Sequence, residues 1–235
     1  SSQGVNRNAV SEHAMALILA FARHIHTGRD NQRGHHWRGM ISNLLQREQE
    51  LGGKTMLIVG MGAIGSRLAK LAKAFDMRVV ATKRNPATAQ GPADEVHTPD
   101  RLPDLLTQAD FVVLTCPLTP ETEKIIDAKV LSLMKNSACL INVARGLLVD
   151  EDALADALLT GNIGGAGIDV FGQEPPDASR PEYHLPNIIV TPHTAGQTDD
   201  TVRRRCQIVV ENVQRLAAGD YLLHQVDASA GLGKF

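Results

Sequence analysis

A glycine-rich turn between an apolar strand and a helix constrains this chain more than any other feature. Gly60, Gly62 and Gly65 are spaced as GxGxxG, directly after the apolar run Met56–Val59 and at the start of a run with helical periodicity. The first glycine allows a tight turn, the second lets the backbone approach a phosphate, and the third permits close helix–strand packing. The free N–H groups at such a helix start bind phosphates. The spacing therefore predicts a βαβ unit that binds a dinucleotide.

The rest of the chain continues this alternation of short β-rich runs and helical runs, which is typical of a parallel sheet covered by helices on both faces. We expect strands at Met56–Val59, Arg78–Thr82, near Val96, and at Phe111–Cys116, Cys139–Val143, Ala166–Val170 and Ile188–Thr191. We expect helices at Val10–His24, Ile64–Phe75, Leu102–Thr107, Asp127–Met134, Glu151–Leu159 and Thr198–Ala218. The predicted fold is a doubly wound α/β parallel sheet of the Rossmann type, over residues 51–218.

Composition excludes several classes of function. The chain has 24 basic and 26 acidic residues, a net charge of −2, which argues against binding nucleic acid by bulk electrostatics. Aromatic residues make up 3%, too few for the stacking platforms of single-strand binders. The longest apolar run, Ala14–Ala22, is about half of the ~20 residues that cross a bilayer, so we expect no membrane span. The 3 cysteines lack CxxC spacing and the 9 histidines lack an HExxH motif, which predicts a reducing, cytoplasmic setting and no metal site.

The end of the second expected strand indicates which dinucleotide binds. An NAD site usually places an acidic residue there for the ribose 2′-hydroxyl. Here the strand ends in Lys83 and Arg84, and Asp76 lies before the strand, at its opposite end. Lysine and arginine pair with a 2′-phosphate, which a carboxylate would repel. We therefore expect NADP(H), with NAD possible; the alternative is that both side chains simply face water.

Further stretches at 114–122 (LTCPLTPET), 141–151 (INVARGLLVDE), 165–175 (GAGIDVFGQEP) and 191–196 (TPHTAG) carry polar and charged groups. Together with the glycine motif they resemble the D-isomer-specific 2-hydroxyacid dehydrogenase family. The resemblance runs from Val10 to about Asp227. It implies a Rossmann cofactor domain and the interconversion of a 2-oxo acid and its D-2-hydroxy acid, with glyoxylate, hydroxypyruvate or 3-phosphoglycerate among the candidate acids.

The resemblance also implies residue roles. Arg145 would bind the substrate carboxylate and polarise the 2-oxo group, His193 would be the general acid in reduction and the base in oxidation, and Glu174 would pair with His193. Lys83 stands where the family usually has its ribose-binding aspartate, which puts the choice of cofactor in doubt. Besides the three glycines, Lys83, Arg84, Arg145 and His193, the implied cofactor-binding residues are Asp169 at the nicotinamide carboxamide, Ala63 and Ile64 at the pyrophosphate, and Cys116, Pro117, Thr122, Val143, Ala144 and Gly196.

The chemistry of these residues agrees with the resemblance. Cys116, Arg145, Asp169, Glu174 and His193 lie at or just beyond the carboxyl ends of expected strands, the edge where an open parallel sheet binds ligands. Imidazole titrates near pH ~6.5 and can protonate a ketone oxygen as hydride arrives, and a guanidinium grips a carboxylate with two parallel bonds. Each residue taken alone could instead be a loop cation, a surface acid or a histidine at a helix entry. Their coincidence beside the glycine motif favours an active site.

The first 50 residues have a different character. The expected helix Val10–His24 is followed by a polar segment rich in glycine and histidine, Thr27–Gly39, which contains the only tryptophan, Trp37. A long polar loop is unusual inside a compact domain. It is either a disordered surface loop or an arm that becomes ordered against a second subunit. We assign residues 1–50 to a first helix and a dimerisation arm, and expect a homodimer.

Members of the resembled family contain a second, substrate domain that begins at their N-terminus. Because the resemblance here starts at the beginning of the chain, we expect most of that domain, ahead of Gly4, to be absent. Residues 219–235 would form a tail that returns to it and is mobile without it. We expect cofactor binding with little turnover, since closure over the site is impaired. The alternative function is a nucleotide-sensing dimeric regulator similar to the C-terminal-binding corepressors, which resemble the enzymes at the same positions.

Overall fold

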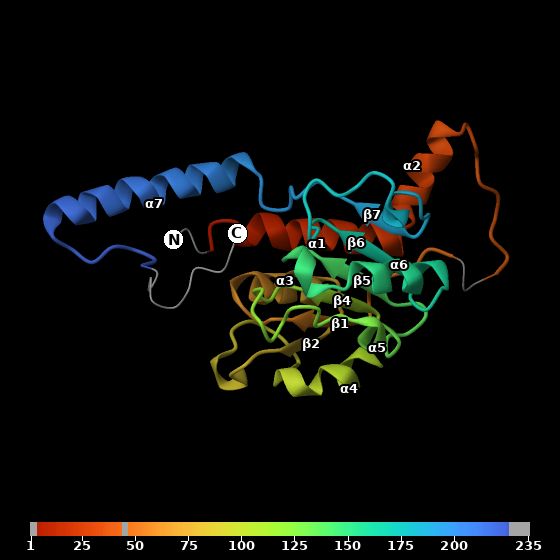
Figure 1. Cartoon of the computed structure of the whole chain (residues 1–235), viewed down its shortest axis with the longest axis horizontal. Coiled ribbons are helices and arrows are strands. Elements are labelled where there is room, and N and C mark those ends of the chain that lie inside the picture. Colours follow the sequence, from red (N-terminus) through yellow and green to blue (C-terminus); the bar gives the residue numbers. More distant parts are fainter. Residues whose placement is uncertain (1–3, 44–46, 226–235) are drawn as a thin grey trace.

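The computed structural model describes residues 4–43 and 47–225 and has one seven-stranded, wholly parallel sheet (Figure 1). The strand order is β3-β2-β1-β4-β5-β6-β7. The order reverses between β1 and β4, which creates the crevice where doubly wound sheets bind ligands. The strands are β1 (Thr55–Val59), β2 (Arg78–Thr82), β3 (Glu95–His97), β4 (Phe111–Leu114), β5 (Cys139–Asn142), β6 (Gly165–Ile168) and β7 (Ile188–Val190). The predicted doubly wound α/β fold is confirmed.

Two apolar clusters cover the two faces of the sheet. Along β1, Met56 and Ile58 belong to one cluster, whereas Leu57 and Val59 belong to the other, because successive side chains of a strand point to opposite faces. The first face is covered by α1 (Arg7–Ala22) and α3 (Ala63–Ala74), and the second by α4 (Leu102–Leu106), α5 (Ala128–Leu131) and α6 (Glu151–Leu159). Helix α1 is thus part of the core of the sheet. The division at residue 50 stays a prediction.

Several elements are shorter than expected at the carboxyl edge of the sheet. Strands β4, β5, β6 and β7 end one or two residues before the predicted limits, at Leu114, Asn142, Ile168 and Val190. The predicted site residues that follow these observed strand ends therefore lie in turns, outside the hydrogen-bonded strands.

Two helices also differ from their predicted bounds. Helix α1 begins three residues earlier than predicted and ends two earlier, and α5 has one helical turn rather than two.

The segment Thr27–Gly39 is helical as far as Arg33, so the expectation of a loop was wrong over that part, and the alternative of an arm that contacts a second subunit stays a prediction. Helix α2 (Ile25–Arg33) follows α1 after a break at His24, whose φ is +51°. The error came from treating the absence of an apolar stripe as the absence of a helix. None of the α2 residues is buried, and a helix polar on all sides leaves no periodic apolar pattern to detect. Figure 1 shows α2 projecting away from the sheet.

The last helix, α7 (Asp199–Ala218), begins one residue later than predicted and runs away from the sheet (Figure 1). The Thr198 side chain caps its first turn by accepting from the N–H of Thr201, and Gly219 ends it with a φ of +76°. Thr201 is the only α7 residue that is buried. Among the described helices none is long and apolar enough to cross a membrane. Of the predicted C-terminal tail, residues 226–235 lie outside the described part.

Short 3-10 turns complete the connections at Pro86–Thr88, Pro99–Arg101, Gly146–Leu148 and Pro181–Tyr183.

Candidate active site

The three glycines of the motif are required for different physical reasons. Gly60 has a φ of +106°, and a Cβ there would lie 2.7 Å from the Cys116 backbone. A Cβ on Gly65 would lie 2.5 Å from the carbonyl oxygen of Gly60. Packing of the chain alone therefore requires glycine at both positions. A Cβ on Gly62 would meet nothing within 4 Å, so only something outside the described chain, such as a ligand, would require glycine there.

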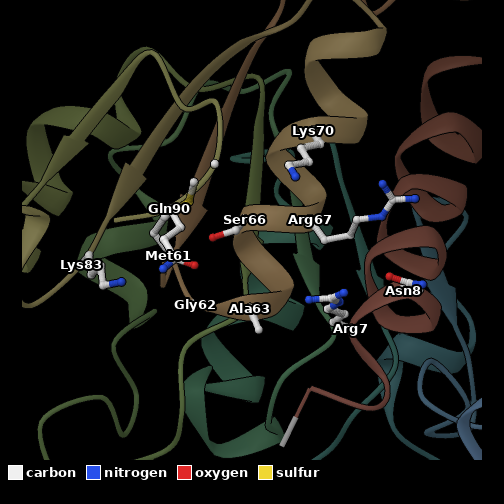
Figure 2. A pocket seen from close by; sticks show the side chains of 11 residues that line it. Arg7, Asn8, Met61, Gly62, Ala63, Ser66, Arg67, Lys70, Lys83 and Gln90 are labelled. Atoms are coloured by element: carbon white, nitrogen blue, oxygen red, sulfur yellow. The ribbon is translucent and has the colours of Figure 1, made fainter. Parts of the chain in front are cut away.

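Gly62 opens into a pocket of about 670 Å³ that runs over the start of α3 (Figure 2). Gly62 is the N-cap of α3 and offers no side-chain acceptor to the free N–H groups of the first turn. These groups and the positive end of the helix dipole favour an anion. The described residues that line the pocket include four cations and no carboxylate; they are Arg7, Asn8, Met61, Gly62, Ala63, Ser66, Arg67, Lys70, Lys83, Gln90 and Gly91. A dinucleotide pyrophosphate fits this donor set.

Three of the four cations were missed by reasoning from motifs. Arg67 and Lys70 follow Ala63 by four and seven residues on α3, so helical periodicity from the glycine motif could have found them. Arg7, at the start of α1, could not be found that way, because only the packing of α1 beside α3 brings it to the pocket. Arg67 extends from α3 toward α1 (Figure 2), and its Nε is buried without a hydrogen-bond partner among the described residues.

Lys83 and Arg84 differ in how they face the pocket. Lys83 lines it at the carboxyl end of β2, and its Nζ donates to the carbonyl oxygen of Thr88 at 2.8 Å. Arg84 is exposed and outside the lining; its charge helps to lower the pKa of the Glu121 carboxyl, after the larger effect of the Thr119 hydroxyl. Asp76 lies in the turn before β2, at the opposite edge of the sheet.

At the other half of the same edge, Glu174 and His193 form an ion pair. The distance between Glu174 Oε2 and His193 Nδ1 is 2.7 Å, and the side chains are 37% and 49% exposed. Glu174 follows β6 and His193 follows β7, and the other carboxylate oxygen accepts from the N–H of Phe171 at 3.0 Å. Burial raises the pKa of Glu174, but the His193 hydrogen bond, the Phe171 N–H and the charges of His193 and Arg145 outweigh it, so this pKa lies below its ordinary value.

Because Nδ1 of His193 is engaged by Glu174, the imidazole presents Nε2 as the nitrogen that no described residue binds. The backbone of His193 is left-handed, with a φ of +52°, which is uncommon outside glycine. Its N–H donates to the carbonyl oxygens of Asp169 at 2.8 Å and Thr191 at 3.0 Å. The imidazole is thus oriented both by its carboxylate partner and by a constrained turn.

Arg145 follows β5 and is exposed at the same edge. Its Nη1 donates to the carbonyl oxygen of Ala144 at 2.7 Å, which leaves most of the guanidinium donors free. The next residue, Gly146, lies against Phe171, since a Cβ there would come within 1.9 Å of the Phe171 carbonyl carbon. This close approach joins the Arg145 loop to the loop that carries Glu174.

The carboxylate of Asp169 is buried and binds groups of the chain itself. Its side chain is 1% exposed; Oδ1 accepts from Thr191 Oγ1 at 2.6 Å and from the Thr194 N–H at 2.9 Å, and Oδ2 accepts from the Ala195 N–H at 2.9 Å. The carboxylate therefore supports the turn around His193. A further role at a nicotinamide carboxamide stays a prediction.

The remaining predicted cofactor residues are spread along the edge, and most have structural partners. Cys116 is buried beneath Gly60, and burial raises the pKa of its thiol to about 11. The Thr122 hydroxyl donates to the Pro117 carbonyl oxygen and accepts from the Thr119 N–H within its own loop. Ile64 is half-buried in the first turn of α3, Val143 is buried, the Ala144 N–H donates to Asn142 Oδ1, and Gly196 packs against Asn6. No three potential metal ligands gather among the described residues.

Comparison with known proteins places this geometry in context. Residues 15–195 match the family described as D-isomer specific 2-hydroxyacid dehydrogenase, NAD binding domain. The chain is 39% identical to glycerate dehydrogenase of Methylorubrum extorquens over 219 residues, 90% of this chain and 66% of that protein. It is 38% identical to D-3-phosphoglycerate dehydrogenase of Mycobacterium tuberculosis over 230 residues, 97% of this chain and 42% of that protein.

A solved structure agrees with these matches. The D-isomer specific 2-hydroxyacid dehydrogenase of Xanthobacter autotrophicus, in complex with NADPH and MES, superimposes with a TM-score of 0.81 at 31% identity, over 96% of this chain and 90% of that one. The chain spans less than two thirds of the length of the two curated relatives. The fold, the glycine motif and the matched residues lead to one conclusion: the chain belongs to the D-isomer-specific 2-hydroxyacid dehydrogenase family and contains its NAD-binding domain.

Proposed function

We propose that this chain carries the cofactor site and the proton-transfer residues of an NAD(P)-dependent oxidoreductase that interconverts a small 2-oxo acid and its D-2-hydroxy acid. The observation that carries the proposal is the 2.7 Å pair of His193 Nδ1 and Glu174 Oε2, at the sheet edge that also holds Arg145 and the glycine cradle. The relatives named glycerate and D-3-phosphoglycerate dehydrogenase support the substrate class.

The proton steps follow from the side chains. Glu174 binds Nδ1 of His193 and orients the ring, so that Nε2 can donate a proton to the 2-oxo oxygen in reduction and accept it in oxidation. Arg145 carries a permanent charge with several free donors, suited to a substrate carboxylate. The bound nicotinamide cofactor supplies or takes up the hydride. Gly62 and the first turn of α3 would hold its pyrophosphate, with Arg7 and Arg67 as additional charge partners.

We infer that the preferred cofactor is NADP(H). Lys83 lines the pocket at the end of the strand where an NAD site usually has a carboxylate, and Arg84 follows it. The acid nearest to the strand in sequence, Asp76, lies at the opposite end of β2. The lysine ammonium keeps two of its three hydrogens for a 2′-phosphate. The structure of the Xanthobacter relative in complex with NADPH supports this inference.

The double substitution Lys83→Asp/Arg84→Ala tests the cofactor assignment. Titrating NADP and NAD by calorimetry should show NADP affinity falling by ~10–100-fold, because two cations are removed and one repulsive carboxylate is added. NAD affinity should hold or rise. Lys129→Asp/Arg101→Ala makes the same change in charge on elements away from the pocket and should leave both affinities unaltered. Equal affinities before and after the Lys83/Arg84 change would refute the 2′-phosphate assignment.

Turnover of a panel of 2-oxo acids tests the activity itself. NADPH oxidation is followed with glyoxylate, hydroxypyruvate and 3-phosphohydroxypyruvate, using this chain and the longest form of the protein that can be expressed. We expect oxidation with at least one acid, and the 235-residue chain to be the slower form, since a site open to solvent excludes water poorly. Tight NADPH binding without oxidation by any acid would instead support a nucleotide-sensing regulator.

We propose that the arm formed by α2 and residues 34–43 contacts a second copy of the chain. Its apolar side chains are unusually exposed for a monomer surface: Trp37 is 94% exposed, Met40 92% and Ile25 62%. Light scattering of the wild type and of Trp37→Ser/Met40→Ser should show a dimer that the substitutions weaken. A wild-type monomer at high concentration would contradict the proposal.

A second surface is proposed to be covered by a substrate domain. Helix α7 exposes a stripe of apolar side chains, each more than half exposed; they are Val202, Val209, Val210, Val213 and Leu216. In the described chain residues 220–225 fold back on α7 through the Asn212 amide and the Leu223 backbone, and Arg204 on α7 donates to the Val5 carbonyl oxygen. Limited proteolysis should cut α7 readily in the 235-residue chain and slowly in a longer form that covers it; equal cutting would argue against such a domain.

A further inference from the structure

His13 lies on α1, outside the group formed by Arg145, Glu174 and His193, and yet it is connected to that group. Its Nε2 is 3.0 Å from Thr191 Oγ1, just after β7, and 3.7 Å from Asp169 Oδ1, just after β6. The His13 side chain is 23% exposed, whereas Asp169 is 1% exposed. A helix on one face of the sheet therefore reaches the carboxyl ends of two strands.

The hydrogens of this chain of contacts can be assigned from its geometry. Thr191 has one hydroxyl hydrogen, and at 2.6 Å from Asp169 Oδ1 it is donated to the carboxylate, which can only accept. The Thr191 oxygen can then only accept from the imidazole. His13 must therefore carry a hydrogen on Nε2, and the polarity runs from His13 through Thr191 to Asp169.

Asp169 in turn binds the backbone of the turn that carries His193. Its two oxygens accept from the N–H groups of Thr194 and Ala195, both at 2.9 Å, and its main-chain carbonyl accepts from the His193 N–H at 2.8 Å. His193 sits in this turn with a φ of +52°. Residues other than glycine rarely adopt that backbone conformation, and it persists only where the surrounding structure enforces it. Three consecutive N–H groups bound to one residue supply that enforcement.

We propose that His13 is a positioning residue for His193. By donating to Thr191 it orients the hydroxyl that binds Asp169, and so keeps the carboxylate in the one placement that holds residues 193–195. The inference rests on the proposed function for its catalytic meaning, because His193 is there the proton donor. The structural relay itself does not depend on turnover or on a bound cofactor, and its test uses neither.

The test is amide hydrogen exchange at Thr194 and Ala195, measured by NMR in the 235-residue chain. His13→Leu removes the donor, and exchange at these two amides should rise by on the order of tenfold, the size expected for loss of one hydrogen bond in a cooperative network. His13→Gln keeps an N–H donor on a similar reach and should exchange like the wild type. That rescue separates a donor role from a merely space-filling one.

A matched control and a second pair of variants keep the proposal refutable. His97→Leu removes a similarly exposed imidazole, also beside a carboxylate, at the far side of the sheet, and should leave Thr194 and Ala195 unchanged. If His13→Leu raises exchange throughout β1 as well, the chain is destabilised globally, and Thr191→Val against Thr191→Ser decides, since valine removes the hydroxyl and serine retains it.

Unchanged exchange in His13→Leu, failure of His13→Gln to restore protection, or equal exchange in the valine and serine variants of Thr191 would each overturn the relay. A failure of the proposed function gives a different pattern: His13→Leu still accelerates exchange, while no 2-oxo acid is reduced by any form of the protein. The two hypotheses are therefore separable in one set of samples.

Discussion

The two halves of the sheet edge are built in different ways. Over β1 and β2 the candidate nucleotide site is made mainly of backbone: an open glycine, Gly62, and the free N–H groups of α3. Over β5 to β7 the candidate chemical site is made of side chains from three separate loops, Arg145, Glu174 and His193. The backbone half occupies six consecutive residues, whereas the paired atoms of the side-chain half come from residues 19 apart in the sequence.

This difference determines which substitutions each half of the sheet edge tolerates. A backbone site fails when a Cβ intrudes, whatever that side chain is, and its glycines also hold the fold together. A side-chain site fails when one functional group is lost, and the turn around it can remain intact. On the side-chain half, substitutions should therefore lower activity without lowering stability. On the backbone half, some glycine substitutions should lower stability and others only cofactor binding.

The largest expected effect is on the side-chain half. His193→Gln should lower the rate of 2-oxo acid reduction by ~10²–10⁴-fold, the usual contribution of a general acid, with the thermal midpoint held. Rates are measured in the longest form of the protein that can be expressed. His184→Gln, an exposed histidine on the loop before β7, is the control and should retain the rate. A comparable rate in His193→Gln would remove His193 from the mechanism.

The next effect divides the glycines of the backbone half. Gly65→Ala places a Cβ 2.5 Å from the Gly60 carbonyl oxygen and should destabilise the chain by about 1–3 kcal/mol, as overpacked cores do. Gly62→Ala meets no atom within 4 Å and should leave the unfolding midpoint unchanged while weakening NADPH binding by ~10-fold or more. Thermal unfolding and calorimetric titration measure the two quantities. Equal loss of stability in both variants would show that Gly62 serves the fold.

A smaller effect concerns the pH dependence of the His193–Glu174 pair. Burial opposes the shift, but the His193 hydrogen bond and the Phe171 N–H leave the pKa of Glu174 below its ordinary value. A carboxyl with a lowered folded pKa stabilises the fold above its unfolded pKa of ~4.3. That contribution is lost as the pH falls through the folded pKa, and it is small because both side chains are partly exposed.

Carboxyl carbon NMR shifts against pH should give a midpoint for Glu174 below that of an ordinary glutamate. His193→Phe removes the donor and should move the midpoint upward. A midpoint at or above the ordinary value in the wild type would mean that the ion pair does not form in solution.

The smallest effect reports on packing beneath the backbone half. Burial raises the pKa of Cys116 to about 11 and that of Cys139 to about 12, whereas Cys206 on α7 is exposed. A thiol reagent at pH 8 should therefore modify one cysteine quickly, because the thiolate is the reactive form. Cys206→Ser should abolish the fast phase. A second fast thiol would indicate that the turn over Cys116 opens readily.

The features that could be predicted from the sequence follow the same division between local and distant contacts. Local patterns located the glycine turn, the strands and the sheet class, because apolar periodicity and glycine spacing act over a few residues. The polar helix α2 was missed, since nothing in it is buried. Arg7 was missed because its place beside Ala63 depends on how α1 packs against α3, and the internal bonding of Asp169 was not foreseen for the same reason.

The amino-acid sequence by itself determined the doubly wound parallel sheet and the position of the phosphate cradle, because both depend on interactions between near neighbours. It also supplied the candidate residues of the chemical site through the resemblance of its motifs. Only the tertiary structure decided that Glu174 faces His193 at 2.7 Å, and that Asp169 and His13 are bound into the turn beneath His193. Those contacts join separate loops, and their geometry is set by the packing of whole strands and helices.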